Sequence, residues 1–136
     1  MPPVSIARIP FILDRHLEAS FLGAIIAFPG EKFEPAEQTS LWLRPTFITD
    51  GRMLDGEKGR DGYSRRDGAY LVDIFTPAKT GARADCLDMA EQVEAAFRRR
   101  CLSGLMLGDP YTEDKGIDPY DNYFVRVTAL WWCWAA

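Results

Sequence analysis

The chain has 136 residues, of which 47% are hydrophobic and 12% aromatic, enough apolar material for one core without disulfides or metals. We therefore expect a single domain over residues 1–136. The formal charge of −4 at pH 7 and a sequence pI near 5.0 argue against tight non-specific binding of nucleic acid by the subunit as a whole.

The first predicted element is a helix. Apolar residues recur at helical spacing from Ile6 to Phe21, and we place the helix after Pro10 because proline suits a first turn. A short apolar strand is expected over residues 24–28, and a polar loop follows it. Residues 41–49 predict the next strand, in which Pro45 indicates an edge or a bulge.

Residues 50–67 predict a long hairpin loop between two antiparallel strands. The segment holds four glycines and ten charged residues and has no apolar period. It has too few apolar side chains to offset its ordering entropy, so it is either a solvated hairpin tip or a loop that becomes ordered on a partner. Its basic residues are therefore interface candidates: Arg52, Lys58, Arg60, Arg65 and Arg66.

A strand, a turn and a helix follow directly. Residues 69–75 are rich in β-branched and aromatic residues, and Pro77 and Gly81 predict the turn. The helix after it is expected to bury one stripe, with Phe97 as its anchor, and to end in three arginines that complement the helix dipole. The stripe consists of Leu87, Ala90, Val93, Phe97 and Cys101.

The last third of the chain ends in the clearest strand, over residues 123–134. Before it, residues 102–107 suggest a brief strand, and residues 111–120 mix apolar and charged residues without a strand pattern. Large aromatic residues occupy both faces of the last strand, so either helices flank it or a neighbouring subunit covers Trp132 and Trp134. The whole predicts an α+β fold: an antiparallel or mixed sheet of four or five strands with two helices packed on one face.

The residues offer little catalytic chemistry. His16 is the only histidine, and one imidazole cannot supply the usual two or three histidines of a zinc site. The acids between Asp109 and Asp121 do not match the spacing of a calcium loop. Cys86, Cys101 and Cys133 contain no CxxC pair, so free, largely buried thiols are expected. We predict no catalytic residue, no cofactor and no metal.

Several blocks of the sequence resemble the small tail terminator or tail completion proteins of long-tailed bacteriophages and of phage-like gene transfer particles. The order and spacing of the blocks between Ala24 and Arg100 carry the resemblance, not a single motif. The blocks are Ile25-Ile26-Ala27-Phe28-Pro29, Phe33-Glu34-Pro35, Leu41-Trp42-Leu43-Arg44-Pro45-Thr46, Gly68-Ala69-Tyr70-Leu71-Val72-Asp73-Ile74-Phe75, Gly81, Ala90-Glu91 and Ala96-Phe97.

This resemblance implies an α+β subunit of a six-fold ring that stops growth of the tail tube and joins the tail to the head connector. It implies as partners other copies of the chain, the tail tube protein and a connector or stopper protein, with DNA passing through the bore without sequence-specific binding. No apolar run is long enough to span a membrane and the chain starts without basic residues, so we expect assembly in the host cytoplasm and a place in the virion tail or neck.

Other functions stay open at this stage. Another head-tail joining or minor tail protein would fit the same blocks. A small nucleic-acid-binding module would need the basic residues of the loop and of Arg98 to Arg100 to form one patch. An enzyme would need the acids or His16 to converge.

Overall fold

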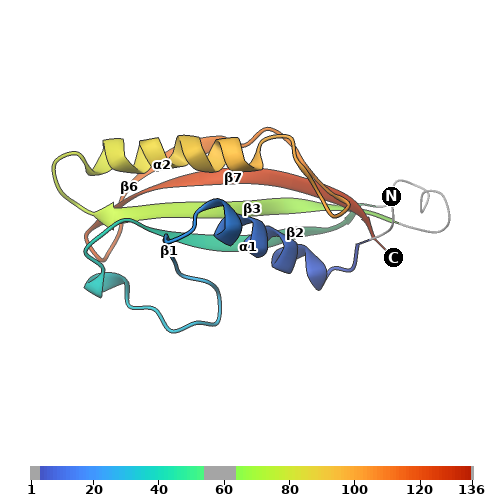
Figure 1. Ribbon diagram of the computed structural model, residues 1–136, viewed down its shortest axis with the longest axis horizontal. Coiled ribbons are helices and arrows are strands. Elements are labelled where there is room, and N and C mark those ends of the chain that lie inside the picture. The colour runs from blue at the N-terminus through green and yellow to red at the C-terminus, as the bar shows by residue number, and fades with distance from the viewer. Residues whose placement is uncertain (1–3, 54–63, 136) are drawn as a thin grey trace.

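A computed structural model describes residues 4–53 and 64–135. The elements along the chain (Figure 1) are α1 (Arg8–Ser20), β1 (Ile25–Ile26), the 3-10 helix η1 (Pro35–Glu37), β2 (Trp42–Met53), β3 (Ser64–Pro77), α2 (Ala82–Phe97), β4 (Cys101–Leu102), β5 (Leu105–Leu107), β6 (Tyr111–Ile117) and β7 (Asn122–Ala135). Within the described residues, neither helix is long and apolar enough to cross a membrane.

The strands form one mixed sheet in the order β1-β2-β3-β7-β5-β4, and β6 pairs with β7 as well. β1 runs parallel to β2, and all other pairs are antiparallel. The predicted α+β class is confirmed, but the predicted four or five strands are too few, because the described residues alone form a sheet of seven. The expected strand over residues 24–28 is β1, and the expected brief strand over 102–107 is divided into β4 and β5. β6 was not predicted, because it is largely exposed and charged and carries no readable alternation.

The predicted loop over residues 50–67 is wrong at both ends. β2 continues to Met53 and β3 begins at Ser64, so both strands extend into the segment that was expected to be irregular. Pairing with the opposite strand supports this extension although the segment has few apolar residues, and the register shifts only between Thr49 and Arg52. Residues 54–63, which include Lys58 and Arg60, lie outside the described residues.

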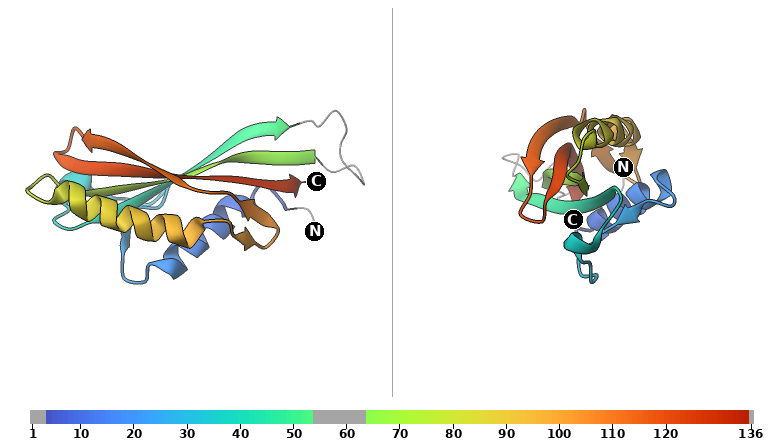
Figure 2. Two further views of the ribbon diagram at one scale, coloured as in Figure 1. Left: turned by 90° about the horizontal axis from the view of Figure 1, so that it is seen from above. Right: turned by 90° about the vertical axis from the view of Figure 1, so that its left-hand side faces the viewer.

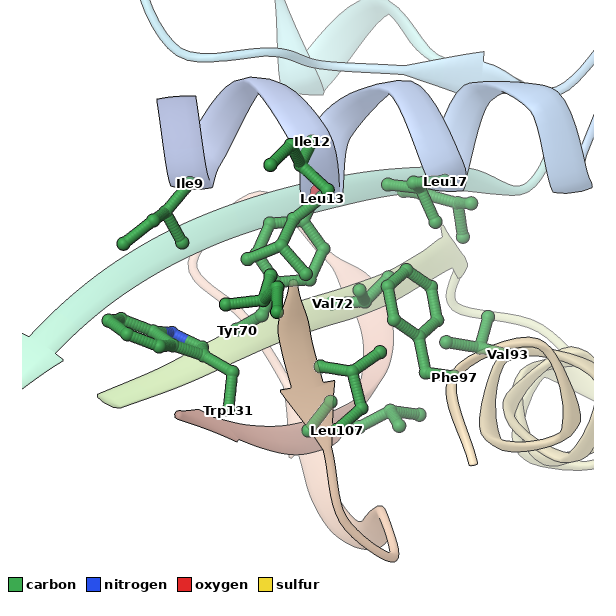
Figure 3. Close-up of a cluster of buried hydrophobic side chains, with 14 of the residues drawn as sticks. Ile9, Ile12, Leu13, Leu17, Tyr70, Val72, Val93, Phe97, Leu107 and Trp131 are labelled. Atoms are coloured by element: carbon green, nitrogen blue, oxygen red, sulfur yellow. The ribbon is translucent and has the colours of Figure 1, made fainter. Parts of the chain in front are cut away.

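The main core lies between the sheet and the two helices. Tyr70, Val72 and Ile74 of β3 stand beside Ala129, Val127 and Val125 of β7, because directly opposite residues share a face. Ile9, Leu13 and Leu17 of α1 and Val93 and Phe97 of α2 pack on the same cluster (Figure 3). Both helices lie on one side of the strongly twisted sheet, as Figure 2 shows end on.

α1 begins slightly earlier than expected, at Arg8. Pro10 is then its third residue, where the missing N–H costs no helical hydrogen bond. Before the helix, the Val4 N–H donates to the Trp134 carbonyl at 2.7 Å, so the start of the described chain is fixed to the end of β7.

α2 follows the expected turn, with Gly81 at a φ of 88°, a conformation that favours glycine. Its predicted stripe is right for Ala90, Val93 and Phe97, which are all buried. It is wrong at both ends: Leu87 is 37% exposed, and Cys101 lies beyond the helix, exposed on β4. Cys86, one residue before Leu87, is buried in its place, because the buried face turns with the 3.6-residue helical period.

The three arginines after α2 lie outside the helix, which ends at Phe97. Arg98 instead pairs with Glu94 at 3.0 Å, and Arg99 forms two hydrogen bonds with Asp109. The contact of Arg99 with Asp109 connects the chain leaving α2 to the segment that leads into β6.

Candidate interaction surface

The face of the sheet away from the helices, here called the helix-free face, is the candidate site. Alternate residues of four neighbouring strands point to it, in cross-strand rows set by the register. Its members with described side chains include Trp42, Arg44, Thr46 and Ile48 on β2, Arg65, Asp67, Ala69, Leu71, Asp73 and Phe75 on β3, Tyr111 and Glu113 on β6, and Phe124, Arg126, Thr128, Leu130, Trp132 and Trp134 on β7.

One end of this face is covered by its own chain. Phe124, Phe75 and Trp42 form an aromatic row with ring centroids 4.9 Å and 4.1 Å apart. Phe33 and Ala27, from the loop after β1, pack over the row and close a small second core. Stacked pairs of this kind contribute about 0.5–1.5 kcal/mol each beyond their burial.

The next row, here called the charged row, consists of Glu113, Arg126, Asp73 and Arg44 on β6, β7, β3 and β2. The Asp73 carboxylate is 1% exposed and accepts hydrogen bonds from Arg126 at 2.7 Å and from Arg44 at 3.3 Å. The pKa of the Arg126 guanidinium is raised above its ordinary value, mainly by its hydrogen bond to Asp73 and against the effect of its own burial. No local sequence pattern indicates this row, because its members are brought together by the strand register alone.

Apolar side chains follow the charged row and stay in contact with water. Leu130 is 51% exposed, Tyr111 50% and Ile48 39%. Leu130 and Ile48 flank Ala69 in one row, and Tyr111 lies opposite Thr128 in the row before it. Exposed apolar side chains gathered on one sheet face are typical of an interaction surface.

Three predicted interface residues meet at the far end of this face. Trp132 and Trp134 pack edge to face with centroids 6.1 Å apart, and the Arg65 guanidinium lies 4.6 Å from the Trp132 ring centroid. Asp67 lies 3.9 Å from Arg65 and opposite Trp132 on the neighbouring strand. Both tryptophans are half-buried, so part of each ring remains exposed.

The other predicted interface residues do not join this cluster. Arg66 lies opposite Cys133 and therefore on the helix side of β3, since neighbouring residues of a strand alternate faces. The backbone of Arg52 pairs with that of Arg66, and nothing is described of its side chain. Lys58 and Arg60 fall outside the described residues.

A groove of about 730 Å³ borders the free edge of β2 beyond β1. Its walls include Phe28 and Pro29, where the chain turns away from β2, and Pro45 and Phe47 of β2 itself. Asp14 of α1 also lines it and accepts a hydrogen bond of 2.5 Å from the Tyr70 hydroxyl. Burial raises the pKa of Asp14 despite this hydrogen bond, and burial together with the Asp14 contact raises the pKa of Tyr70.

His16 and the acids near β6 have local partners. The ring of His16 forms a hydrogen bond of 2.7 Å with the Ala96 carbonyl at the end of α2. Asp114 binds Arg83 at 2.8 Å, and Asp118 accepts two backbone N–H groups in the turn before β7. Among the described residues, no three metal-binding side chains gather in one place.

Comparisons with known proteins give a fold and no family. No known protein family and no curated protein matches the sequence. Among solved structures, one protein whose name states no function matches with a TM-score of 0.61 and 14% identity, over 93% of this chain and 96% of that chain. At this identity the likeness concerns the fold alone. The chain therefore takes a fold already seen in nature, and its function has to be argued from its surfaces.

Proposed function

We propose that this chain is a structural virion protein that forms a ring, of six copies, at the head-proximal end of a phage-like tail tube. The ring ends growth of the tube and joins the tail to the head connector. The proposal starts from the resemblance of the sequence blocks to tail terminator proteins. The main blocks fall, in chain order, on β1, the start of β2, β3 and the second half of α2.

The observation that carries the proposal is the helix-free face. A single subunit leaves Leu130, Tyr111 and Ile48 in water there, beside the cluster of Arg65, Trp132 and Trp134. Apolar and aromatic side chains beside an arginine are the composition of interface hot spots. A subunit whose task is assembly needs such a surface, and the catalytic alternative gains no comparable support from the local partners of His16 and Asp114.

Deleting the gene in the particle that encodes it tests the proposal. Loss of a terminator gives tubes of uncontrolled length and tails that do not join heads, both visible in electron micrographs. Reconstruction of intact particles should show six copies at the head-proximal end of the tube. Normal tails without the protein, or a single copy at that position, would contradict the proposal.

A further inference from the structure

Among residues 4–53 and 64–135, nothing pairs with one edge of β2 over most of its length. β1 pairs only with Trp42 and Leu43, and the Ala27 N–H makes the last contact, donating to the Leu43 carbonyl at 2.8 Å. Backbone polar groups alternate sides along a strand, so those of Pro45, Phe47 and Thr49 point to the same side as the Leu43 carbonyl. The groove beside Pro45 and Phe47 shows that this side is open at that point.

β6 forms the opposite edge of the sheet at the level of Arg44. It pairs with β7 on one side, and no strand of the described chain pairs with its other side. Its side chains are largely exposed, including Tyr111 and Glu113 on the helix-free face.

The directions of the two edges allow copies to join head to tail. β2 is antiparallel to β3, β3 to β7 and β7 to β6, so β2 and β6 run in opposite directions within one subunit. A second copy related by rotation about an axis along the strands keeps the same strand directions. Its β6 would therefore meet β2 as an antiparallel neighbour.

The charged row has ends of opposite charge. Across the sheet it runs Glu113, Arg126, Asp73, Arg44, which alternates negative and positive. Both end groups are partly exposed, since the side chains of Glu113 and Arg44 are each 46% exposed. Each also has a partner within its own subunit: Glu113 pairs with Lys115 at 3.5 Å and Arg44 with Asp73 at 3.3 Å, so a second copy would share these groups. Repeating the subunit at the same level would place Arg44 beside the next copy's Glu113 and continue the alternation without a break. In the next row of the same face, two residues along each strand, Thr46 would lie opposite Tyr111 of the next copy. Tyr111 is half exposed in the single subunit.

We propose that copies of this chain join edge to edge, with the open edge of β2 in one copy pairing with β6 of the next, in the register that sets Arg44 opposite Glu113. The inference rests on the proposed ring and names its contact. The ring contact is heterologous, as a closed cyclic ring of more than two copies requires. It leaves the helix-free face uncovered, for the tube or the connector.

Both edges carry features that weaken pairing. Pro45 supplies no N–H to the open edge, and the register of β6 shifts between Asp114 and Gly116, leaving Lys115 as an extra charged residue. Such devices keep edge strands from aggregating. The ladder between copies is therefore short, and the free chain should be mainly monomeric until assembly brings copies together.

Cysteine cross-linking tests the register. In a Cys101→Ser background, which removes the exposed native thiol, we combine Thr46→Cys with Tyr111→Cys. Directly opposite residues bring their Cβ atoms to about 4.5–5.5 Å, close enough for a disulfide after a small shift. Mild oxidation of the concentrated double variant should give a ladder of covalent oligomers on a denaturing gel, whereas each single variant should stay monomeric.

The matched control replaces Thr46→Cys by Leu130→Cys, which is exposed on the same face but not on an edge, and it should give no ladder. Adding Glu113→Lys to the double variant should reduce the yield of oligomers several-fold, whereas Glu91→Lys on α2 should not. The absence of a ladder, or dimers from either single variant, would overturn the edge contact. If the edge contact fails this test, six copies in reconstructed particles would still support the proposed function. If a ladder forms but the particles contain no ring, only the edge contact between β2 and β6 would be supported.

Discussion

At the scale of single residues, Gly68 occupies a position with no room for a side chain. A Cβ atom there would meet the Ile48 carbonyl oxygen at 2.1 Å, the Trp131 ring at 2.7 Å and the Thr49 Cα at 2.9 Å. The first and last of these are backbone atoms, which cannot rotate away. Gly68→Ala should therefore lower the free energy of unfolding by about 1–3 kcal/mol, as overpacked cores do.

Urea denaturation checks this, with Gly108→Ala as the control, because a Cβ at Gly108 meets nothing within 4 Å. The control should change the free energy of unfolding by about 0.5 kcal/mol or less. Equal effects of the two variants would contradict the close approach of the β2 backbone to Gly68.

Phe97 should be the anchor of α2. It is fully buried, with its ring 4.9 Å from His16 and 5.6 Å from Tyr70. Phe97→Ala should cost about 3–5 kcal/mol, a large part of a typical total of 5–15 kcal/mol. Leu87→Ala, at the partly exposed end of the predicted stripe, should cost less than about 1 kcal/mol. Chemical denaturation measures both, and a loss below about 1 kcal/mol for Phe97→Ala would contradict its placement.

Asp14 should give the fold a measurable pH dependence. Burial raises its pKa above the ordinary 3.8 in the folded chain, so the unfolded chain loses this proton first as pH rises. The contribution of Asp14 to stability should fall from about pH 3.8 up to its raised folded pKa and stay constant above it. Asp14→Asn keeps a hydrogen-bond acceptor for Tyr70 and removes the titration.

The measurement is the free energy of unfolding of both proteins across acidic pH. The informative quantity is the value for the native chain minus the value for Asp14→Asn. Subtracting the variant removes the contribution of the other acids, such as Asp109, whose pKa is lowered by Arg99. A difference that rises with pH would contradict the assigned direction.

At the scale of elements, patterns with strong local causes were predicted well. β7 and the unit of β3, turn and α2 follow from alternation, from Pro77 and Gly81, and from helical spacing that local chain geometry dictates. The brief strand expected over residues 102–107 corresponds to β5 and the end of β4, whereas β6 depends on pairing with β7, which no local pattern records. The turn of β4 and β5 contains Ser103 and Gly104, both with positive φ, a hairpin signal that the sequence reading missed.

The charged row gives a testable prediction at this scale. Arg126 is the closer and more buried partner of Asp73, and Arg44 is the more exposed one. Arg126→Met should therefore lower the free energy of unfolding by about 3 kcal/mol, because a buried carboxylate loses its main partner. Arg44→Met should cost about 1 kcal/mol or less, since exposed pairs contribute little. Equal losses, measured by urea denaturation, would show that the two arginines share Asp73 evenly.

At the scale of the whole molecule, the sequence predicted part of the interaction surface. Trp132, Trp134 and Arg65 were named from composition, and the register brings them together. Leu130, Ile48 and the charged row were not named, because each becomes visible only when the strand order is known. Arg66 was named with Arg65, but the two alternate to opposite faces of β3. Once β3 was known to start at Ser64, that alternation could have been read from the sequence.

The last prediction concerns the helix-free face in the assembled particle. If copies join through their edges, this face remains free to meet the tube or the connector. Leu130→Glu should leave the fold intact, because Leu130 is 51% exposed, with a change in unfolding free energy of about 1 kcal/mol or less. It should also leave the cross-linked ladder of the Thr46→Cys, Tyr111→Cys variant unchanged.

Particles that carry Leu130→Glu should nevertheless show loose tails or overlong tubes in micrographs, because a buried, unpaired carboxylate opposes closure of an apolar contact. Leu87→Glu, on the outer face of α2, is the matched control and should give normal particles. Normal particles from Leu130→Glu would contradict a role for this face in joining. If the variant removed the ladder instead, the face itself would belong to the contact between copies.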